Sequence, residues 1–181
     1  MSNNSMNFTG KSTLTDAEFF QNYEQLWEKS PHENNWPSKE EIAKRKREGA
    51  KRYNSEADSL PGEEWRMLPN DEHYFISTMG RVKYNDVIVP QDDTERTGYL
   101  KLDVEKKLNV DHSVHVYTLV ATAFRAKKEG DGYDVHHIDN NGYDNRPENL
   151  ILLTRAQHNA VHRDEKLSQV ELKAFFEQTE L

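Results

Sequence analysis

The chain has 181 residues, a formal net charge of −8 at pH 7, 31% charged residues and no cysteine. Without cysteine it can form neither disulfides nor thiolate zinc sites, which is typical of proteins from a reducing compartment. No apolar run approaches the roughly 18 residues that a transmembrane helix needs, so we expect a cytoplasmic protein with no membrane partner.

The N-terminal region is predicted to contain a polar tail and one aromatic helix. Residues 1–13 are rich in Asn and Ser, as disordered segments are. Thr15 and Glu18 have the spacing of a helix cap. Aromatic and apolar residues follow at helical spacing, namely Phe19, Phe20, Tyr23, Leu26 and Trp27. They form either a packing face or a partner-binding face.

A second predicted helix carries the densest basic run of the chain. Ser38 and Glu41 form a capping box at its start. The basic residues include Lys44, Arg45 and Arg47. This run is either a solvated helix face or a contact to DNA phosphates. Residues 54–62 then read as a linker.

The next region is predicted to be rich in β-strands. Expected strands cover residues 74–77, 81–84, 87–89 and 98–104, and a short apolar helix covers residues 117–124. Gly80 is expected at a turn with positive φ.

Four of the eight histidines lie in one segment, residues 133–163. The predicted order is a strand (135–138), a loop rich in Asn, Asp, Gly and Pro (139–147), a strand (149–153) and a helix (155–163). Thr154 and Gln157 form a capping box for the helix. His158 and His162 are four residues apart and share one helix face. His136 and His137 are neighbours on a strand and point to opposite faces.

This segment resembles the HNH endonuclease family, also called the ββα-metal fold. The motif consists of His136-His137, Asn149, His158 and His162, and the flanking words VHHIDNN and NRPENL are also family-like. Asn149 and His158 are nine positions apart (158 − 149), a separation familiar from colicin-type nucleases.

The resemblance implies a role for each motif residue. His137 would be the general base, since a neutral imidazole with a pKa near ~6.5 can accept a proton at neutral pH. Asn149 would clamp the loop and orient His137 through hydrogen bonds to the backbone. His136, His158 and His162 would hold one divalent metal ion and leave a position open for the scissile phosphate, although some relatives use only two ligands.

The metal is expected to be Mg²⁺ or Mn²⁺ by resemblance, whereas imidazole ligands favour the binding of Zn²⁺ or Ni²⁺. Two other interpretations stay open. One is a structural zinc site without catalysis, and the other is an inactivated nuclease that serves as a DNA-binding module.

The preceding β-rich region resembles the NUMOD-type motif found before the HNH module in phage and homing-type nucleases. The matching residues are Trp65, Tyr74, Ile76, Ser77, Gly80, Arg81 and Val82. Residues 117–124 resemble a further word of the family, but Tyr117 and Thr118 replace its His-Arg pair. This departure leaves the start of that helix without an expected polar role.

DNA contacts are predicted at six basic residues: Arg146, Arg81, Lys83, Lys44, Arg45 and Arg47. Arg146 lies within the motif loop and is the preferred phosphate contact. Because phosphate contacts from Lys and Arg dominate DNA binding, the net charge of −8 predicts weak non-specific affinity unless the basic groups share one face.

The predicted fold class is α+β, with a small antiparallel β region, a ββα-metal module and appended N-terminal helices. The expected divisions are 1–61 (tail, helices, linker), 62–126 (NUMOD-type region), 127–165 (HNH module) and 166–181 (C-terminal helix). The expected function is a metal-dependent endonuclease of homing or phage type that nicks or cuts double-stranded DNA. The alternatives are a nuclease subunit of a phage DNA-packaging complex and a non-catalytic DNA-binding protein. A homodimer or a phage protein partner, in the cytoplasm of a bacterial host, fits this context.

Overall fold

The computed structural model describes residue 15 and residues 17–22, 38–69, 71–92, 98–102, 114–125, 127 and 130–163. The predicted polar tail and the predicted C-terminal helix lie outside these residues. None of the described helices is long and apolar enough to cross a membrane.

The described chain is a mixture of helices and antiparallel strands, as the α+β prediction states. The elements in order are α2 (Lys39–Tyr53), β1 (Trp65–Leu68), β2 (Asp71–Ser77), β3 (Val82–Tyr84), β4 (Val87–Ile88), β5 (Gln91–Asp92), β6 (Lys101–Leu102), β7 (Val114–His115), α4 (Val116–Phe124), β8 (Tyr133–His137), the 3₁₀ turn η1 (Pro147–Asn149), β9 (Leu150–Thr154) and α5 (Arg155–Arg163). Residues 17–22 are also helical.

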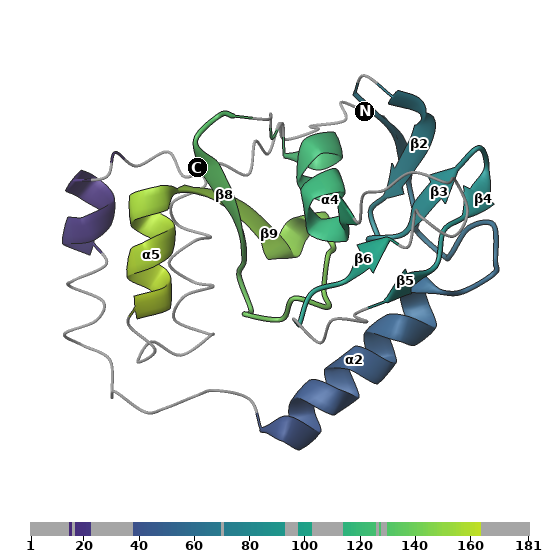
Figure 1. The fold of residues 1–181 in the computed structure, drawn as a ribbon, viewed down its shortest axis with the longest axis horizontal. Helices are drawn as coiled ribbons and strands as arrows, with labels where there is room; N and C mark the ends of the chain where they lie inside the picture. The colour runs from purple at the N-terminus through teal and green to yellow at the C-terminus, as the bar shows by residue number, and fades with distance from the viewer. Residues whose placement is uncertain are drawn as a thin grey trace, which may run out of the picture.

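The strands form three sheets with the orders β1-β2-β3-β4, β5-β6-β7 and β8-β9. Figure 1 shows the β8–β9 hairpin with α5 beside it, the four-stranded sheet at the opposite end, and α4 between them. Helix α4 contacts β1 and β2 on one side and β8 and β9 on the other. It therefore joins the hairpin to the larger sheet.

One apolar core runs beneath these elements. Its buried members are Tyr53, Ile76, Val82, Val89, Leu100, Leu102, Val116, Val120, Tyr143 and Leu150. They come from α2, the sheets, α4, the 139–147 loop and β9. The loop of the histidine motif is thus packed into the same core as the rest of the described chain.

The helix caps predicted from the sequence are confirmed. The Thr15 hydroxyl accepts a hydrogen bond from the Glu18 amide at 3.3 Å, and the Glu18 carboxylate accepts one from the Thr15 amide at 2.9 Å. The Ser38 hydroxyl accepts from the Glu41 amide at 3.1 Å. The Glu41 carboxylate, however, pairs with Arg45 at 3.0 Å rather than closing the box.

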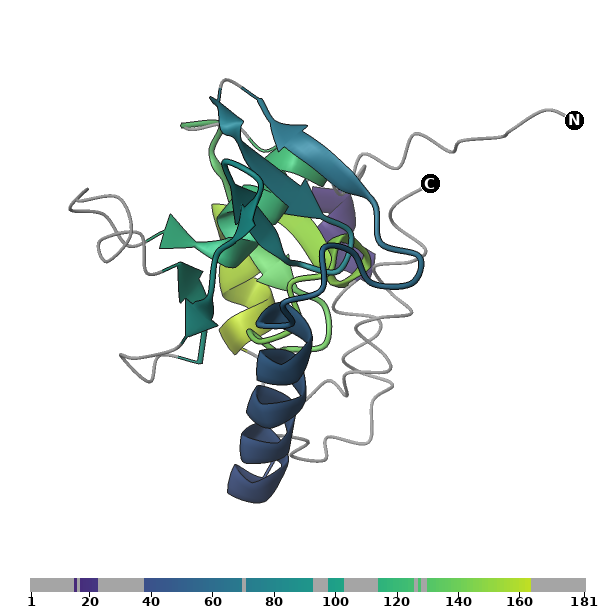
Figure 2. The ribbon, with the colours of Figure 1, turned by 90° about the vertical axis from the view of Figure 1, so that its right-hand side faces the viewer.

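Helix α2 begins at this cap and ends against the body of the protein. Gly49 and Tyr53 are its buried residues, and both lie near its C-terminal end. Its N-terminal part extends away from the sheets (Figure 2). The basic run therefore lies on a helix that projects from the protein and is anchored at its C-terminal end.

The predicted linker has no helix or strand, but it is fixed to the sheet. The Arg81 guanidinium pairs with Glu63 at 2.7 Å and donates to the carbonyls of Ser55 and Ala57. Both side chains of the ion pair are fully buried. The segment is therefore part of the packed body.

Candidate active site

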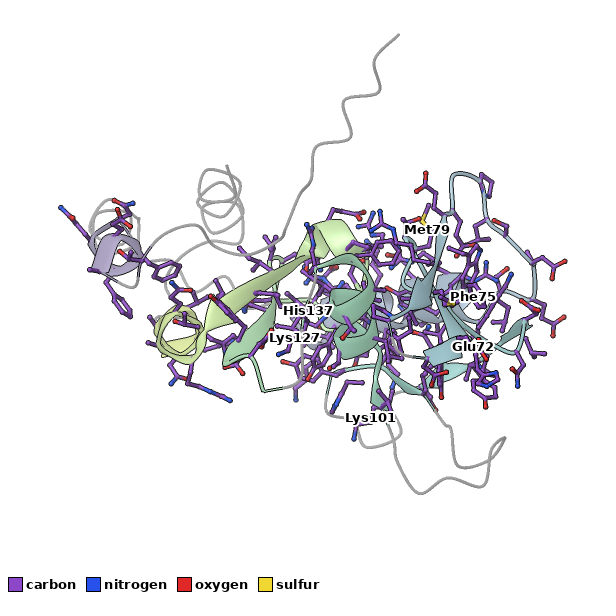
Figure 3. The ribbon with its side chains drawn as sticks, turned by 90° about the horizontal axis from the view of Figure 1, so that it is seen from above. Glu72, Phe75, Met79, Lys101, Lys127 and His137 are labelled. Carbon is purple, nitrogen blue, oxygen red and sulfur yellow. The ribbon has the colours of Figure 1, made fainter. Side chains whose placement is uncertain are left out.

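The β8–β9 hairpin turns the two adjacent histidines to opposite sides. His136 pairs with Ile151 and His137 with Leu150 in an antiparallel register, so their side chains alternate across the hairpin. The His136 ring contacts the rings of His158 and His162 on α5, at 5.6 and 5.0 Å between centroids. On the other side, His137 lies between the hairpin and α4 (Figure 3).

Helix α5 begins where the sequence predicts. The Thr154 hydroxyl accepts from the Gln157 amide at 3.2 Å, and the Gln157 side chain accepts from the Thr154 amide at 3.0 Å. This reciprocal cap fixes the first turn of the helix directly after β9. It holds His158 and His162 over the hairpin face that carries His136.

The side chains of His136, His158 and His162 fit one divalent ion. Their possible ligand atoms all lie within 4.8 Å of one another. His158 Nε2 and His162 Nε2 are 3.2 Å apart, close to the ~3.4 Å between two nitrogens bound at 2.0–2.1 Å in a tetrahedral site. Among the residues that the structure describes, this trio is the one group of three or more potential ligands this close together. Three ligands leave a coordination position for substrate.

The electrostatics of the cluster also favour metal binding. Burial lowers the pKa of His136 well below its ordinary value, with a further contribution from the charges of His162 and His158. Burial likewise lowers the pKa values of His158 and His162. The imidazoles are therefore neutral at pH 7 and carry the lone pairs that a metal ion needs.

Asp134 extends this cluster by one residue that the sequence did not single out. It lies on the same strand face as His136, two residues earlier, and its carboxylate is 3.6 Å from His158 Nδ1 and 3.0 Å from Arg155 Nε. At 3.6 Å the carboxylate is beyond hydrogen-bond distance of His158, and its charge partly offsets the lowering of the His158 pKa by burial.

His137 is almost fully buried, yet it lines a pocket shared with the metal-site histidines. Its Nε2 lies 2.9 Å from Asn145 Oδ1. Burial lowers its pKa, and the hydrogen bond to Asn145 opposes that shift. The pocket is lined by Tyr99, Val135, His136, His137, Asn140, Gly142, His158 and His162. A proton acceptor and a metal site therefore open on one cavity.

Asn149 fastens the loop between the two strands. Its Nδ2 donates to Asp139 Oδ1 and to the Asp144 carbonyl, both at 2.8 Å, and its Oδ1 accepts from the Asp139 amide at 3.2 Å. These bonds tie both ends of the loop together. Asn149 thus acts through the loop, whereas the side chain that forms a hydrogen bond with the His137 ring is Asn145.

Aromatic rings surround His137 on the side of α4. The centroids of Tyr99 and Tyr117 lie 5.7 and 5.5 Å from that of His137, and His115 lies 5.1 Å from Tyr117. The sequence left the start of α4 without a polar role, and the structure places Tyr117 beside the proposed base. Gly142 permits the approach of Tyr99, because a Cβ there would lie only 2.7 Å from Tyr99 Cδ1.

One predicted DNA contact needs correction. Arg81 has no exposed surface. Its guanidinium forms the buried ion pair with Glu63 and donates hydrogen bonds to the linker carbonyls. It cannot reach DNA without breaking that core. Lys83 is half-buried, and its Nζ lies 4.4 Å from the centre of the Trp65 ring.

The other basic residues remain accessible in part. Arg146 is 37% exposed, but it pairs with Asp144 at 2.6 Å and Glu148 at 3.2 Å. Arg45 pairs with Glu41, whereas Lys44 and Arg47 on α2 are exposed. A phosphate at Arg146 would therefore compete with two carboxylates.

Comparison with known proteins identifies the motif. Residues 114–160 match the family model described as HNH endonuclease. This part of the chain is therefore similar to HNH endonucleases. The match starts at β7 and includes α4, so the HNH region as matched begins before the hairpin. This match does not include Trp65 to Val82, so the NUMOD-type resemblance stays a prediction.

A solved structure is similar in part. It is that of the HNH homing endonuclease I-HmuI, from work on its DNA binding and cleavage, with 23% identity and a TM-score of 0.45. The similarity covers 61% of this chain and 66% of that chain. No curated protein matches the chain.

Proposed function

We propose that the chain is a metal-dependent DNA endonuclease that hydrolyses phosphodiester bonds. The observation that carries this proposal is the single pocket that joins the His136–His158–His162 trio to His137. Hydrolysis of a phosphodiester requires an activated water and a site that stabilises charge on the phosphate. The HNH family match of residues 114–160 supports the same reaction class.

Each residue has one role in the proposed mechanism. His137 accepts a proton from the attacking water, and Asn149 keeps the loop closed so that the pocket is formed before substrate arrives. His136, His158 and His162 would hold the ion. A bound divalent ion, Mg²⁺ or Mn²⁺ by family resemblance, would supply Lewis-acid stabilisation of charge on the phosphate and the leaving oxygen.

The geometry favours this function over a structural zinc site. Structural zinc sites are four-coordinate and closed. Here the fourth histidine, His137, lies on the opposite side of the hairpin and outside the ligand group. The trio also opens on a pocket.

The products are proposed to carry 5′-phosphate and 3′-hydroxyl ends, by resemblance to the family. One site per chain acts on one strand at a time, so a monomer would nick DNA and double-strand cutting would need a dimer or two successive events. The homing or phage context is likewise carried over from the motif resemblance.

The test is cleavage of supercoiled plasmid by wild type and His137→Ala with Mg²⁺, Mn²⁺, Zn²⁺ or EDTA. We expect metal-dependent nicking by wild type and a loss of about 10²–10⁴-fold in His137→Ala, the range of a general base. The variant should still bind metal, because His137 is not in the ligand group, and calorimetric titration with Zn²⁺ measures this. Equal cleavage by both proteins would refute the role of His137.

A further inference from the structure

Asn145 is a buried side chain in the motif loop that contacts the proposed base directly. It has no exposed surface, and its Oδ1 lies 2.9 Å from His137 Nε2. The contact brings together two buried polar side chains eight residues apart. No part of the HNH motif as read from the sequence assigns a function to this residue.

The contact bears on which ring nitrogen of His137 carries the proton. A carboxamide oxygen can only accept a hydrogen bond, so with Oδ1 facing the ring Nε2 must be the N–H. Nδ1 then has the lone pair that takes a proton from water. A reversed amide would donate from Nδ2, place the hydrogen on Nδ1 and leave that nitrogen unable to act as a base.

The backbone of Asn145 is fixed from α2. Its amide donates to Tyr53 Oη at 2.9 Å, and Tyr53 is fully buried at the anchored end of the helix. Burial raises the pKa of Tyr53 to about 12, so the hydroxyl stays neutral at physiological pH. Gly80 lies against the same backbone, since a Cβ there would be 3.1 Å from the Asn145 carbonyl carbon and oxygen.

The neighbouring residue is held from the same helix. Arg52 Nη2 lies 3.3 Å from Asp144 Oδ1 and 2.6 Å from Tyr53 Oη. Asp144 in turn receives two hydrogen bonds from the Arg146 guanidinium, at 2.8 and 2.6 Å. Two adjacent loop residues are therefore positioned by the last turn of α2, which lies more than 90 residues away in the sequence.

We propose that Asn145 is a positioning residue that holds His137 in the Nε2–H tautomer, and that Tyr53 of α2 holds Asn145 in place. This inference rests on the proposed endonuclease function only for its effect on catalysis. The tautomer itself is a property of the protein in the absence of DNA. Helix α2 then positions the proposed base through Tyr53 and Asn145, in addition to presenting the basic run.

The test compares three variants in the full-length chain. Asn145→Leu keeps the approximate volume and removes the acceptor, whereas Asn145→Asp keeps an oxygen that can only accept. Tyr53→Phe removes the hydroxyl beneath the Asn145 amide. Tyr74→Phe makes the same chemical change on β2, away from the loop, and serves as the matched control. We expect it to have the melting curve and the cleavage rate of wild type.

The decisive readout is the tautomer of His137, measured by two-bond ¹H–¹⁵N correlation spectra with His137→Ala to assign the signals. Wild type and Asn145→Asp should show the hydrogen on Nε2, and Asn145→Leu should show a mixture or the Nδ1–H form. In plasmid nicking, kcat of Asn145→Leu should fall at least about 10- to 100-fold, the range found when the hydrogen-bond partner of a metal-ligating histidine is removed. KM should change little and Asn145→Asp should recover most of the rate.

An Nδ1–H signal for His137 in wild type would overturn the inference. It would also be overturned if Asn145→Leu kept both the His137 tautomer and the kcat of wild type. If Asn145→Leu does not fold, a Tyr53→Phe protein with unchanged kcat and an unchanged His137 signal would overturn the role of α2. Asn145→Asp losing the Nε2–H form would overturn the role of the oxygen. If wild type cuts no DNA, the proposed function fails, but the spectra still decide the tautomer.

Discussion

Two arginines show how environment decides what a guanidinium can do. Arg81 and Arg146 both read as DNA contacts in the sequence, yet Arg81 is fully buried and Arg146 is 37% exposed. A buried arginine must have its donors satisfied inside the protein. Arg81 meets this requirement at Nη1 and Nη2, which donate to Glu63 and to two backbone carbonyls, whereas its buried Nε has no hydrogen-bond partner among the described residues. We therefore assign Arg81 to stability.

Arg81→Met should therefore lower stability. Removing one partner of a buried ion pair leaves the other uncompensated and costs about 3–5 kcal/mol. The double variant Arg81→Met/Glu63→Leu should recover part of the loss, because no lone charge remains. Urea unfolding of the three proteins measures this. An Arg81→Met protein that is as stable as wild type but binds DNA weakly would show that the sequence-based expectation was right.

Asp144 gives the motif loop a pH dependence of its own. Burial works to raise the pKa of this carboxyl, but hydrogen bonds and charge from Arg146 and the charge of Arg52 outweigh it, so the pKa lies below its ordinary value. A carboxyl whose pKa is lowered by folding adds stability above its unfolded pKa, about 3.9. That stability is lost as the pH falls through the folded pKa.

We accordingly expect Asp144→Asn to be less stable than wild type at pH 7 and to approach it below about pH 4. Urea unfolding of both proteins at a series of pH values isolates the contribution of this one carboxyl. A stability difference that stays constant from pH 7 to pH 3 would mean that the Arg52–Asp144–Arg146 contacts carry no net energy.

At the scale of single elements, capping residues were readable from the sequence because they act within four residues. The caps at Thr15, Ser38 and Thr154 all form. The β8–β9 hairpin and α5 also follow the predicted order, since alternation, loop composition and helical spacing are local properties. The order strand, loop, strand, helix could thus be predicted from the segment itself.

Long-range contacts could not be predicted in the same way. Tyr53 and Asn145 are 92 positions apart in the sequence. No sequence pattern near either residue predicts that the end of α2 contacts the motif loop. Asp134 lies just before the predicted strand 135–138, and only the folded position of α5 brings it near His158. Strand β1 was not predicted, and the buried state of Arg81 depends on the linker folding back onto the sheet.

The cap of α5 should control metal affinity. Thr154→Ala removes an N-cap, which costs about 0.5–2 kcal/mol, and loosens the turn that carries His158. Ser38→Ala is the matched control, because it removes the N-cap of α2 far from the histidines. Calorimetric titration with Zn²⁺ should show weaker binding for Thr154→Ala and wild-type binding for Ser38→Ala. Equal affinities in all three proteins would mean that α5 is positioned by packing alone.

At the scale of the whole molecule, a chain of net charge −8 is proposed to bind a polyanion. Like charges repel, so DNA binding requires a locally positive surface. The projecting helix α2 provides one, since its sequence KEEIAKRKREGAKRY holds seven Lys and Arg against three Glu. Lys44 and Arg47 are exposed on it, whereas Arg45 is engaged with Glu41. The positive groups are thus separated from an acidic remainder.

If α2 follows the phosphate backbone, the salt dependence of DNA binding should report it. Each phosphate contact contributes about −0.9 to the slope of log K against log of the salt concentration. Lys44→Ala/Arg47→Ala should make the slope shallower by up to about 1.8. Arg45→Ala should change it less, because its charge is already paired. These slopes come from fluorescence anisotropy of a labelled duplex at several salt concentrations, with His137→Ala as the background to prevent cleavage. Unchanged slopes in the double variant would place the DNA-binding surface on another part of the protein and leave α2 as the support of the motif loop alone.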